Sequence, residues 1–168
     1  MNHQQQNQGF TIVEVLTVVV ILGLIAAFTI PSMIPMVENL KLQSAANGIR
    51  QKLLMVKTRA LGDSRIHCGV FFDTTSRPQS VYAFIDNETA GNKGSYDAGV
   101  DTRYMEPFEL EPTVSLKITG AGTHRSIIFR GDGSTTVHGM LISVETKNNR
   151  KKNISVLPAT GRIAVTTP

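Results

Sequence analysis

The hydrophobic and polar positions of this 168-residue chain change their pattern at two places. Between Glu14 and Glu38 there is no Asp, Glu, Lys, Arg or His, so 23 consecutive residues carry no ionisable side chain. At about 1.5 Å per residue, about 20 apolar residues cross the roughly 30 Å hydrocarbon core of a bilayer. A cleaved secretory signal fits less well, because the preceding residues include no Lys or Arg and the apolar run is too long. The pattern therefore predicts a membrane-spanning helix over residues 10–37.

Past Pro35 the apolar residues follow steps of three and four, which is typical of a helix with one buried face. The positions on this predicted stripe are Leu42, Ala45, Ala46, Ile49, Leu53, Val56 and Ala60. We expect one helix from about Phe10 to Leu61, with its first half in lipid and its second half packed on a head. Pro31 and Pro35 each lack a backbone donor and are expected to kink or loosen this helix.

The residues after Gly62 predict short β-strands. Strands at 66–72 and 81–85 form a hairpin, and a loop rich in Gly, Asn and Asp covers 86–101. The further strand candidates are 114–118, 126–129, 135–137, 140–145, 153–157 and 162–166. The predicted fold class is α+β, with a long N-terminal helix whose second half covers an antiparallel β-sheet.

The composition of the chain excludes several kinds of functional site. A mass of 18.3 kDa allows one domain of ordinary size, and the mean hydropathy of −0.01 conceals the apolar segment. The single cysteine, Cys68, excludes an intramolecular disulfide and a Cys-based zinc site. Adjacent strand residues point to opposite faces, so we expect Cys68 to be buried and inert rather than paired with His67.

No catalytic, metal-binding or cofactor-binding pattern is present in the sequence. The four histidines are scattered, the Gly-x-Gly sequences at 120–122 and 131–133 lack the full phosphate-loop pattern, and the acidic loop lacks EF-hand spacing. We therefore predict a non-enzymatic protein without a cofactor or a metal.

The charges of the head are unevenly distributed. Residues 60–111 hold four basic and nine acidic side chains, net −5, whereas residues 112–168 hold eight and two, net +6. The predicted basic hairpin consists of Lys147, Arg150, Lys151 and Lys152, with Arg162 on the next strand. It could bind an acidic face of a partner subunit, bind DNA phosphates without reading sequence, or form a solvated turn that protects a sheet edge. DNA is the least favoured of these alternatives.

Glu14 lies at the start of the apolar helix, where a carboxylate normally needs a partner. A cut between Gly9 and Phe10 would create an ammonium group four residues before it, and Glu14 of one subunit could neutralise this group on a neighbour. Alternatively, Thr11 and Glu14 form a capping box that suits the helix dipole. The sequence leaves both interpretations open.

The sequence Gly9-Phe10-Thr11-Ile12-Val13-Glu14-Val15-Leu16 resembles the signal of type IV prepilins and type II secretion pseudopilins. The resemblance implies a leader at residues 1–9, which lacks the usual Lys or Arg. It also implies that a prepilin peptidase cuts after Gly9 and methylates the Phe10 amine, and that Glu14 acts in assembly.

The segments Ile127 to Ser134 and Leu157 to Ile163 resemble the GspH/FimT family of minor pseudopilins and minor pilins. This resemblance implies a type IV pilin-like fold, a single span in the bacterial inner membrane, a periplasmic head at residues 38–168, and other pilins or pseudopilins as filament partners. Two functions stay open: a minor subunit of a type II secretion pseudopilus, or a minor type IV pilin that primes assembly or takes up DNA. In some FimT-type members the last hairpin binds DNA and carries a second Arg two residues after the Gly-Arg, and here that position is Ala164.

Overall fold

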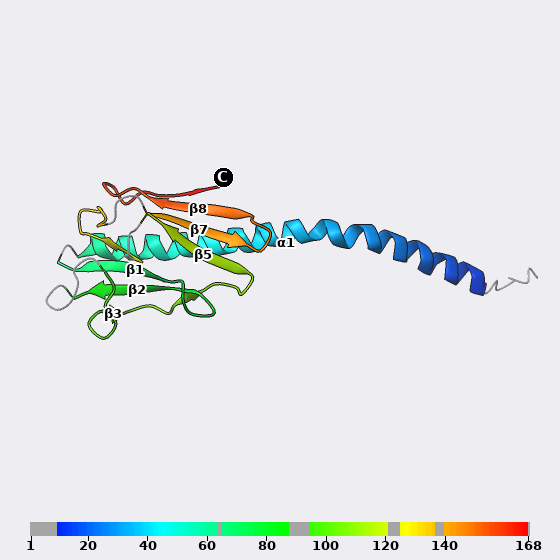
Figure 1. Cartoon of the computed structure of the whole chain (residues 1–168), viewed down its shortest axis with the longest axis horizontal. Helices are drawn as coiled ribbons and strands as arrows, with labels where there is room; N and C mark the ends of the chain where they lie inside the picture. Colours follow the sequence, from blue (N-terminus) through cyan, green and yellow to red (C-terminus); the bar gives the residue numbers. More distant parts are fainter. Residues whose placement is uncertain (1–9, 64, 88–94, 121–124, 137–139, 168) are drawn as a thin grey trace, which may run out of the picture. The chain divides into compact units, whose positions relative to one another are not determined.

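A computed structural model describes residues 10–63, 65–87, 95–120, 125–136 and 140–167. The described residues fall into two compact units, one ending at Val37 and the other beginning at Glu38. One helix, α1 (Ile12–Gly62), contributes to both units (Figure 1). The predicted helix is confirmed to within two residues at each end. Helical backbone continues through Pro31 and Pro35, so neither proline ends the helix.

The first of two antiparallel sheets in the head has the strand order β3-β2-β1-β6, and β4 also pairs with β2. Its strands are β1 (His67–Asp73), β2 (Ser80–Asp86), β3 (Thr102–Arg103), β4 (Phe108–Glu109) and β6 (Ser126–Phe129). The predicted hairpin of the first two strands is confirmed, with Phe71 opposite Tyr82.

The second sheet has the order β5-β7-β8-β9. Its strands are β5 (Val114–Thr119), β7 (Leu141–Thr146), β8 (Lys151–Val156) and β9 (Ile163–Thr166). Burial alternates along β5, where Val114 and Leu116 are buried and Ser115 and Lys117 are exposed. One face of this sheet therefore points to the core and the other to the surroundings.

Three sequence predictions need correction. The single expected sheet is two sheets, and the two-residue strands β3 and β4 were not predicted because such short segments carry no periodicity. The expected strand at 135–137 is absent in its described part, where Thr135 makes only an isolated bridge to Phe129. The Thr135 amide instead donates to the Pro158 carbonyl at 2.8 Å, which takes it out of the ladder. Val137 lies outside the described residues.

The core of the head forms between both sheets and the second half of α1. All seven predicted stripe residues of the helix, from Leu42 to Ala60, are buried in this one apolar cluster. Val70 and Phe72 of β1 contribute from the first sheet, and Ile142 of β7 contributes from the second. The amphipathic period thus predicted the buried face correctly.

A buried glutamine joins the two sheets. The Gln79 side-chain amide donates to the Thr74 carbonyl at 2.8 Å, and its Oε1 accepts from the Leu116 amide at 2.6 Å. Its backbone carbonyl accepts from the Leu110 amide at 2.8 Å. Gln79 is 8% exposed, so these bonds satisfy polar atoms that would otherwise be costly to bury. They connect the β1–β2 turn to the free edge of β5.

Candidate functional site

The start of α1 is a capping box. The Glu14 amide donates to Thr11 Oγ1 at 3.2 Å, and Glu14 Oε2 accepts from both the Thr11 amide and the Thr11 hydroxyl at 3.3 Å. This reciprocal arrangement satisfies donors that the first helical turn leaves open. The structure therefore places Glu14 as a helix cap. Phe10 precedes the cap and is exposed, and Gly9 lies outside the described residues.

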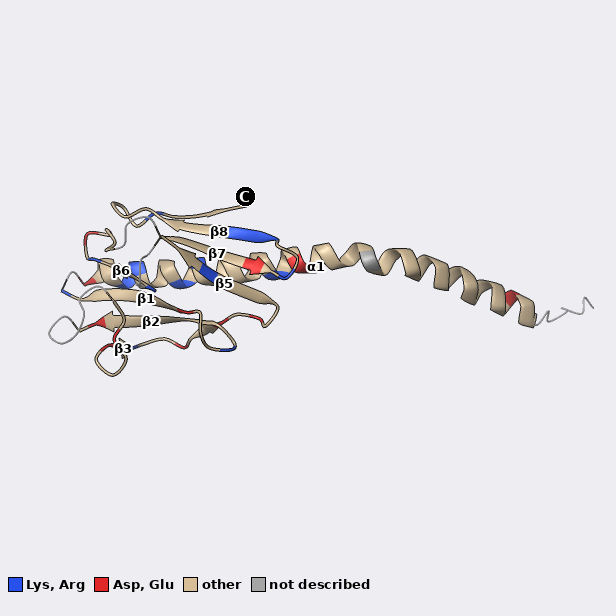
Figure 2. Cartoon of the chain, viewed as in Figure 1, with Lys and Arg blue, Asp and Glu red and all other residues tan. Residues whose placement is uncertain are grey.

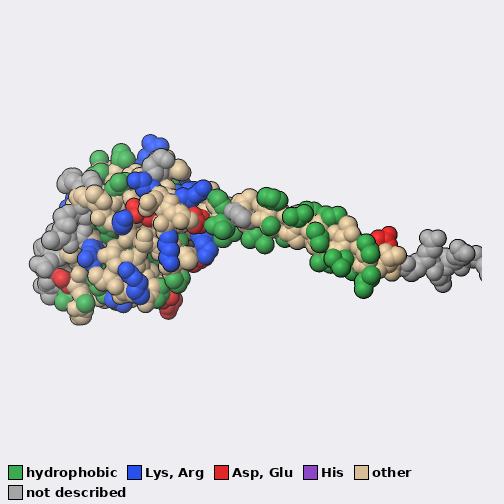
Figure 3. Space-filling view, turned by 45° about the vertical axis from the view of Figure 1, so that its right-hand side comes forward, with side chains coloured by type: hydrophobic (Ala, Val, Ile, Leu, Met, Phe, Trp, Pro, Cys, Tyr) green, Lys and Arg blue, Asp and Glu red, His purple; other side chains and the backbone are tan. Residues whose placement is uncertain are grey.

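The helix that follows this cap is apolar on all sides. An 18-residue window within α1 has a mean hydropathy of 2.6, and none of the window is buried. Leu16, Leu22 and Phe28 are each at least 60% exposed, and the space-filling view shows hydrophobic side chains along this part of the helix (Figure 3). A helix that is hydrophobic all round requires lipid or other helices around it. Length and composition of this segment suit a membrane span.

Figure 2 shows Lys and Arg of the head on β5, on β8 and on the second half of α1, and further Lys and Arg residues lie outside these elements. The predicted basic hairpin, however, does not form one cationic surface. Lys151 and Lys152 are neighbours in β8 and point to opposite faces, and Lys152 is half-buried on the side of buried Ile154. Lys147 and Arg162 are exposed.

Arg150 turns toward α1. Its Nη1 donates to Asn39 Oδ1 at 2.9 Å, and its Nε lies 3.9 Å from Glu38 Oε2. Asn148 of the same turn donates to the other oxygen of Glu38 at 2.5 Å. Arg150 thus holds the β7–β8 turn on the helix and contributes little to a surface for phosphates. Sequence reasoning missed this contact because more than 100 residues separate its partners.

The carboxylate of Glu145 also reduces the positive charge of the second sheet. Lys117 of β5 forms an ion pair with Glu145 of β7 at 2.5 Å, and Lys151 is the register neighbour of Glu145 on β8. Lys151 and Lys117 therefore share a face with one carboxylate. Of the five predicted basic residues, Lys147, Lys151 and Arg162 remain exposed without an ion pair among the described residues.

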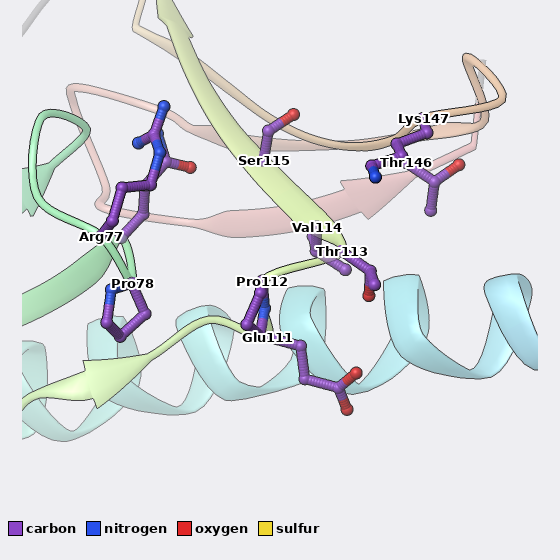
Figure 4. A pocket seen from close by; sticks show the side chains of 10 residues that line it. Arg77, Pro78, Glu111, Pro112, Thr113, Val114, Ser115, Thr146 and Lys147 are labelled. Carbon is purple, nitrogen blue, oxygen red and sulfur yellow. The ribbon is translucent and has the colours of Figure 1, made fainter.

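A cavity of about 490 Å³ adjoins the β7–β8 turn (Figure 4). Arg77 and Lys147 line it from different loops, with Ser115 of β5 between them in this view. The Arg77 guanidinium donates to the carbonyls of Thr74 and Ser76 in its own turn. The lining includes no Ser, Cys or Lys beside a base that could activate it, so the cavity has no nucleophilic pair.

The buried cysteine behaves as predicted. Cys68 is fully buried, and burial raises the pKa of its thiol although the Arg59 guanidinium acts in the opposite direction. A raised pKa keeps the thiol protonated and unreactive. His67 is half-buried beside it in β1. Within the described ranges no group of three or more His, Cys, Asp or Glu side chains could hold a metal ion; His3, His124 and His138 lie outside those ranges.

The comparisons with known proteins agree with both the N-terminal segment and the fold. Residues 4–30 match the family described as the Prokaryotic N-terminal methylation motif. A comparison with curated proteins gives no match. Among solved structures, the chain is similar to the minor pseudopilin EpsH from the Type 2 Secretion System of Vibrio cholerae, with a TM-score of 0.55 and 14% sequence identity. The similarity covers 76% of this chain and 98% of that chain. An N-terminal methylation motif is therefore combined here with a fold that the chain shares with a minor pseudopilin.

Proposed function

We propose that the protein is a non-enzymatic structural subunit of a filament, a minor pseudopilin of a type II secretion pseudopilus. The observation that carries the proposal is the methylation motif at residues 4–30, which includes the start of an exposed apolar helix. The fold shared with EpsH supports the assignment to the minor subunits. Before assembly the chain would sit in the inner membrane through residues 10–37, with residues 38–168 in the periplasm.

Processing by a prepilin peptidase would change the charge at the helix start. Cleavage between Gly9 and Phe10 leaves Thr11 and its hydrogen bonds to Glu14 in place, and it creates an ammonium group directly before the cap. Both hydrogen bonds that Glu14 accepts go to Oε2, so Oε1 can accept from the amine of a neighbouring subunit. Such a pair in an apolar environment is worth far more than the same pair in water. The apolar helices would then surround one another as the filament core.

Mass spectrometry of the mature N-terminus tests the processing step. We expect a chain that begins at Phe10 and is one methyl group heavier than the unmodified sequence. As a matched control, Gly9→Leu should stay uncleaved in the same cells. A wild-type chain that still begins at Met1 in cells with an active prepilin peptidase would refute the proposal.

Glu14→Gln separates the two roles of the glutamate. Glutamine at this position of a capping box still accepts from the helix start, but it carries no charge. If charge pairing drives assembly, Glu14→Gln enters the membrane and is processed normally yet fails to appear in filaments, as does Glu14→Ala. Incorporation of Glu14→Gln at the wild-type level would show that capping is the whole role of Glu14. Membrane fractionation and immunodetection of sheared filaments measure both steps.

The alternative is a minor type IV pilin that binds DNA for uptake, and the exposed Lys147, Lys151 and Arg162 favour it. DNA binding through phosphates weakens steeply with salt. Full-length protein in detergent would shift duplex DNA at low salt, and a variant with Lys147, Lys151 and Arg162 changed to Gln would not. Arg65→Gln, at an exposed residue beyond the helix end, is the matched control. Lack of binding at low salt removes this alternative.

A further inference from the structure

A group of aromatic side chains lies on the face of the first sheet that points away from the core. Core residues Val70 and Phe72 alternate along β1 with Phe71, and Phe71 faces Tyr82 across the ladder. Tyr96 packs on this group, with its ring centroid 4.8 Å from that of Phe71. Phe71, Tyr82 and Tyr96 are each half-buried, so their rings are partly accessible. The chain has only ten aromatic residues, and three of them gather at this accessible place.

Arg103 of β3 lies over these rings. Its Cζ is 4.1 Å from the centre of the Tyr82 ring and 5.3 Å from that of Tyr96, and its Nε donates to the Tyr96 hydroxyl at 2.7 Å. Cation–π contacts of this kind hold a guanidinium plane in a defined orientation. The side chain has therefore already lost much of the conformational freedom that binding would otherwise cost.

Among the described residues, no carboxylate forms an ion pair with Arg103. Arg103 is exposed, and its two terminal nitrogens donate no hydrogen bond within the described part of the chain. The carboxylate of Asp101 is occupied in its own loop, where it accepts from the amides of Asn87 and Asp97. An ordered guanidinium with two free NH₂ groups is suited to a carboxylate, which it can bind with two parallel hydrogen bonds.

The charge of the sequence segment that contains Arg103 indicates which kind of carboxylate ligand it can bind. The segment around Arg103 is acidic, with a net charge of −5 over residues 60–111. Like charges placed against each other disfavour a partner, so an acidic peptide tract or the phosphate chain of DNA would be repelled. A protein surface that presents one carboxylate among neutral or basic residues can pair with the guanidinium and is not repelled by the acidic segment. Tyr and Arg are also the residues that most often dominate protein–protein interfaces.

We propose that Arg103, with Phe71, Tyr82 and Tyr96, is a docking site for one Asp or Glu side chain on the head of a neighbouring subunit. The identity of the partner rests on the proposed function, since a filament supplies neighbouring chains that carry the same N-terminal motif. The docking chemistry itself rests on the ring contacts and the unpaired guanidinium. This site lies on the first sheet, and the basic hairpin belongs to the second.

Photo-cross-linking in cells tests the proposal on the full-length protein. Benzoylphenylalanine placed at Tyr82 keeps an aromatic ring in the cluster and captures whatever lies against it. We expect cross-linked peptides from the head of a chain that begins with the same methylation motif. Arg103→Ala should lower the cross-linking yield about tenfold or more, as truncation of a dominant interface residue does. Arg103→Lys should also lower it, because lysine offers a single point charge in place of a planar fork.

Arg77→Ala is the matched control, since among the described residues the Arg77 guanidinium donates to carbonyls of its own turn. It should leave the yield unchanged. An unaltered melting temperature of Arg103→Ala shows that the head stays folded. If Arg103→Ala unfolds the head, Arg103→Glu combined with Arg at the cross-linked partner carboxylate replaces it as the test, and restored cross-linking supports the proposal.

Several results would overturn the docking site. These are an unchanged yield in a folded Arg103→Ala protein, cross-links to nucleic acid, or a partner peptide without a carboxylate near the cross-link. The N-terminus is measured in the same samples, so failure of the proposed function is seen separately. An unprocessed N-terminus together with an Arg103-dependent cross-link removes the filament but supports the docking site.

Discussion

The two halves of α1 share a backbone conformation but satisfy their apolar side chains in different ways. In residues 12–37 apolar side chains on every side of the helix are exposed, and Leu24 is 57% exposed. In the second half a single stripe is fully covered, and Leu53 is 0% exposed. Polar contacts also fix the second half, as Lys41 does with Glu111 at 2.9 Å. The first half therefore depends on lipid or on other subunits, whereas the second half finds its partner within the chain.

The largest expected difference between the two halves of α1 comes from replacing a leucine with alanine in each half. Leu53→Ala leaves a cavity in the head core and should lower its free energy of unfolding by about 2 to 5 kcal/mol. Leu24→Ala removes an exposed side chain and should change that value by less than about 0.5 kcal/mol. Urea unfolding in detergent, followed by tyrosine fluorescence, measures both. Equal losses would show that the two halves form one cooperative core.

An added positive charge should impair the first half of α1 and leave the second half unaffected. Leu24→Arg places a cation in the middle of the apolar segment and should cost about 2.5 to 3.5 kcal/mol in membrane insertion. Gln51→Arg, at an exposed position of the second half, should insert like wild type. The membrane-bound fraction after alkaline extraction measures the effect. Full insertion of Leu24→Arg would contradict the membrane assignment of residues 10–37.

Two glycines offer a finer test. A Cβ at Gly48 would lie 2.2 Å from the Phe108 ring, whereas a Cβ at Gly23 has no neighbour within 4 Å. Gly48→Ala should therefore displace Phe108 and destabilise the head by about 1 to 3 kcal/mol. Gly23→Ala should leave the head unaffected, because the added Cβ meets no neighbouring atom. It should not weaken the helix either, since alanine is a better helix former than glycine. Thermal unfolding of the two variants gives the difference, and an unchanged midpoint for Gly48→Ala would show that Phe108 moves freely.

Lowering the pH should reduce the stability of the head through Asp73, and we expect this effect to be smaller than those of the substitutions above. Burial raises the pKa of Asp73, but hydrogen bonds from the side chains and amides of Ser76 and Thr75 outweigh it and hold this pKa well below its usual value. A carboxyl with a lowered folded-state pKa adds stability above its unfolded pKa of about 3.9, and that stability is lost as the pH falls further.

Asp73→Asn should consequently weaken the head at neutral pH by less than about 1 kcal/mol, since Asp73 is only half-buried and water screens its charge. The difference from wild type should shrink below about pH 4. Urea titrations between pH 3 and 7 measure it, with Ser76→Ala as an intermediate variant. A difference that grows toward acid would contradict the assigned direction of the pKa.

Sequence reasoning succeeded where the signal was local. Spacing alone predicted the buried stripe from Leu42 to Ala60. The Thr11 and Glu14 pattern left two interpretations open, and the structure shows the capping box, which is one of them. Sequence reasoning failed where the residues that contact each other are far apart along the chain. The five basic residues of the hairpin region read as one patch, yet Arg150 pairs with Glu38 and Asn39, and strand alternation separates Lys151 from Lys152. No period marks Gln79 as the link between two sheets, or Arg103 as a cation held by tyrosine rings.

The sequence by itself determined the charge-free segment, the motif at its start and the amphipathic face of the helix, because these depend on residues within one or two turns of each other. Tertiary structure alone decided that the strands form two sheets and which cations are neutralised. It also decided that tyrosine rings hold the guanidinium of Arg103. Those outcomes depend on side chains brought together from distant positions, where register and strand order decide which charges meet.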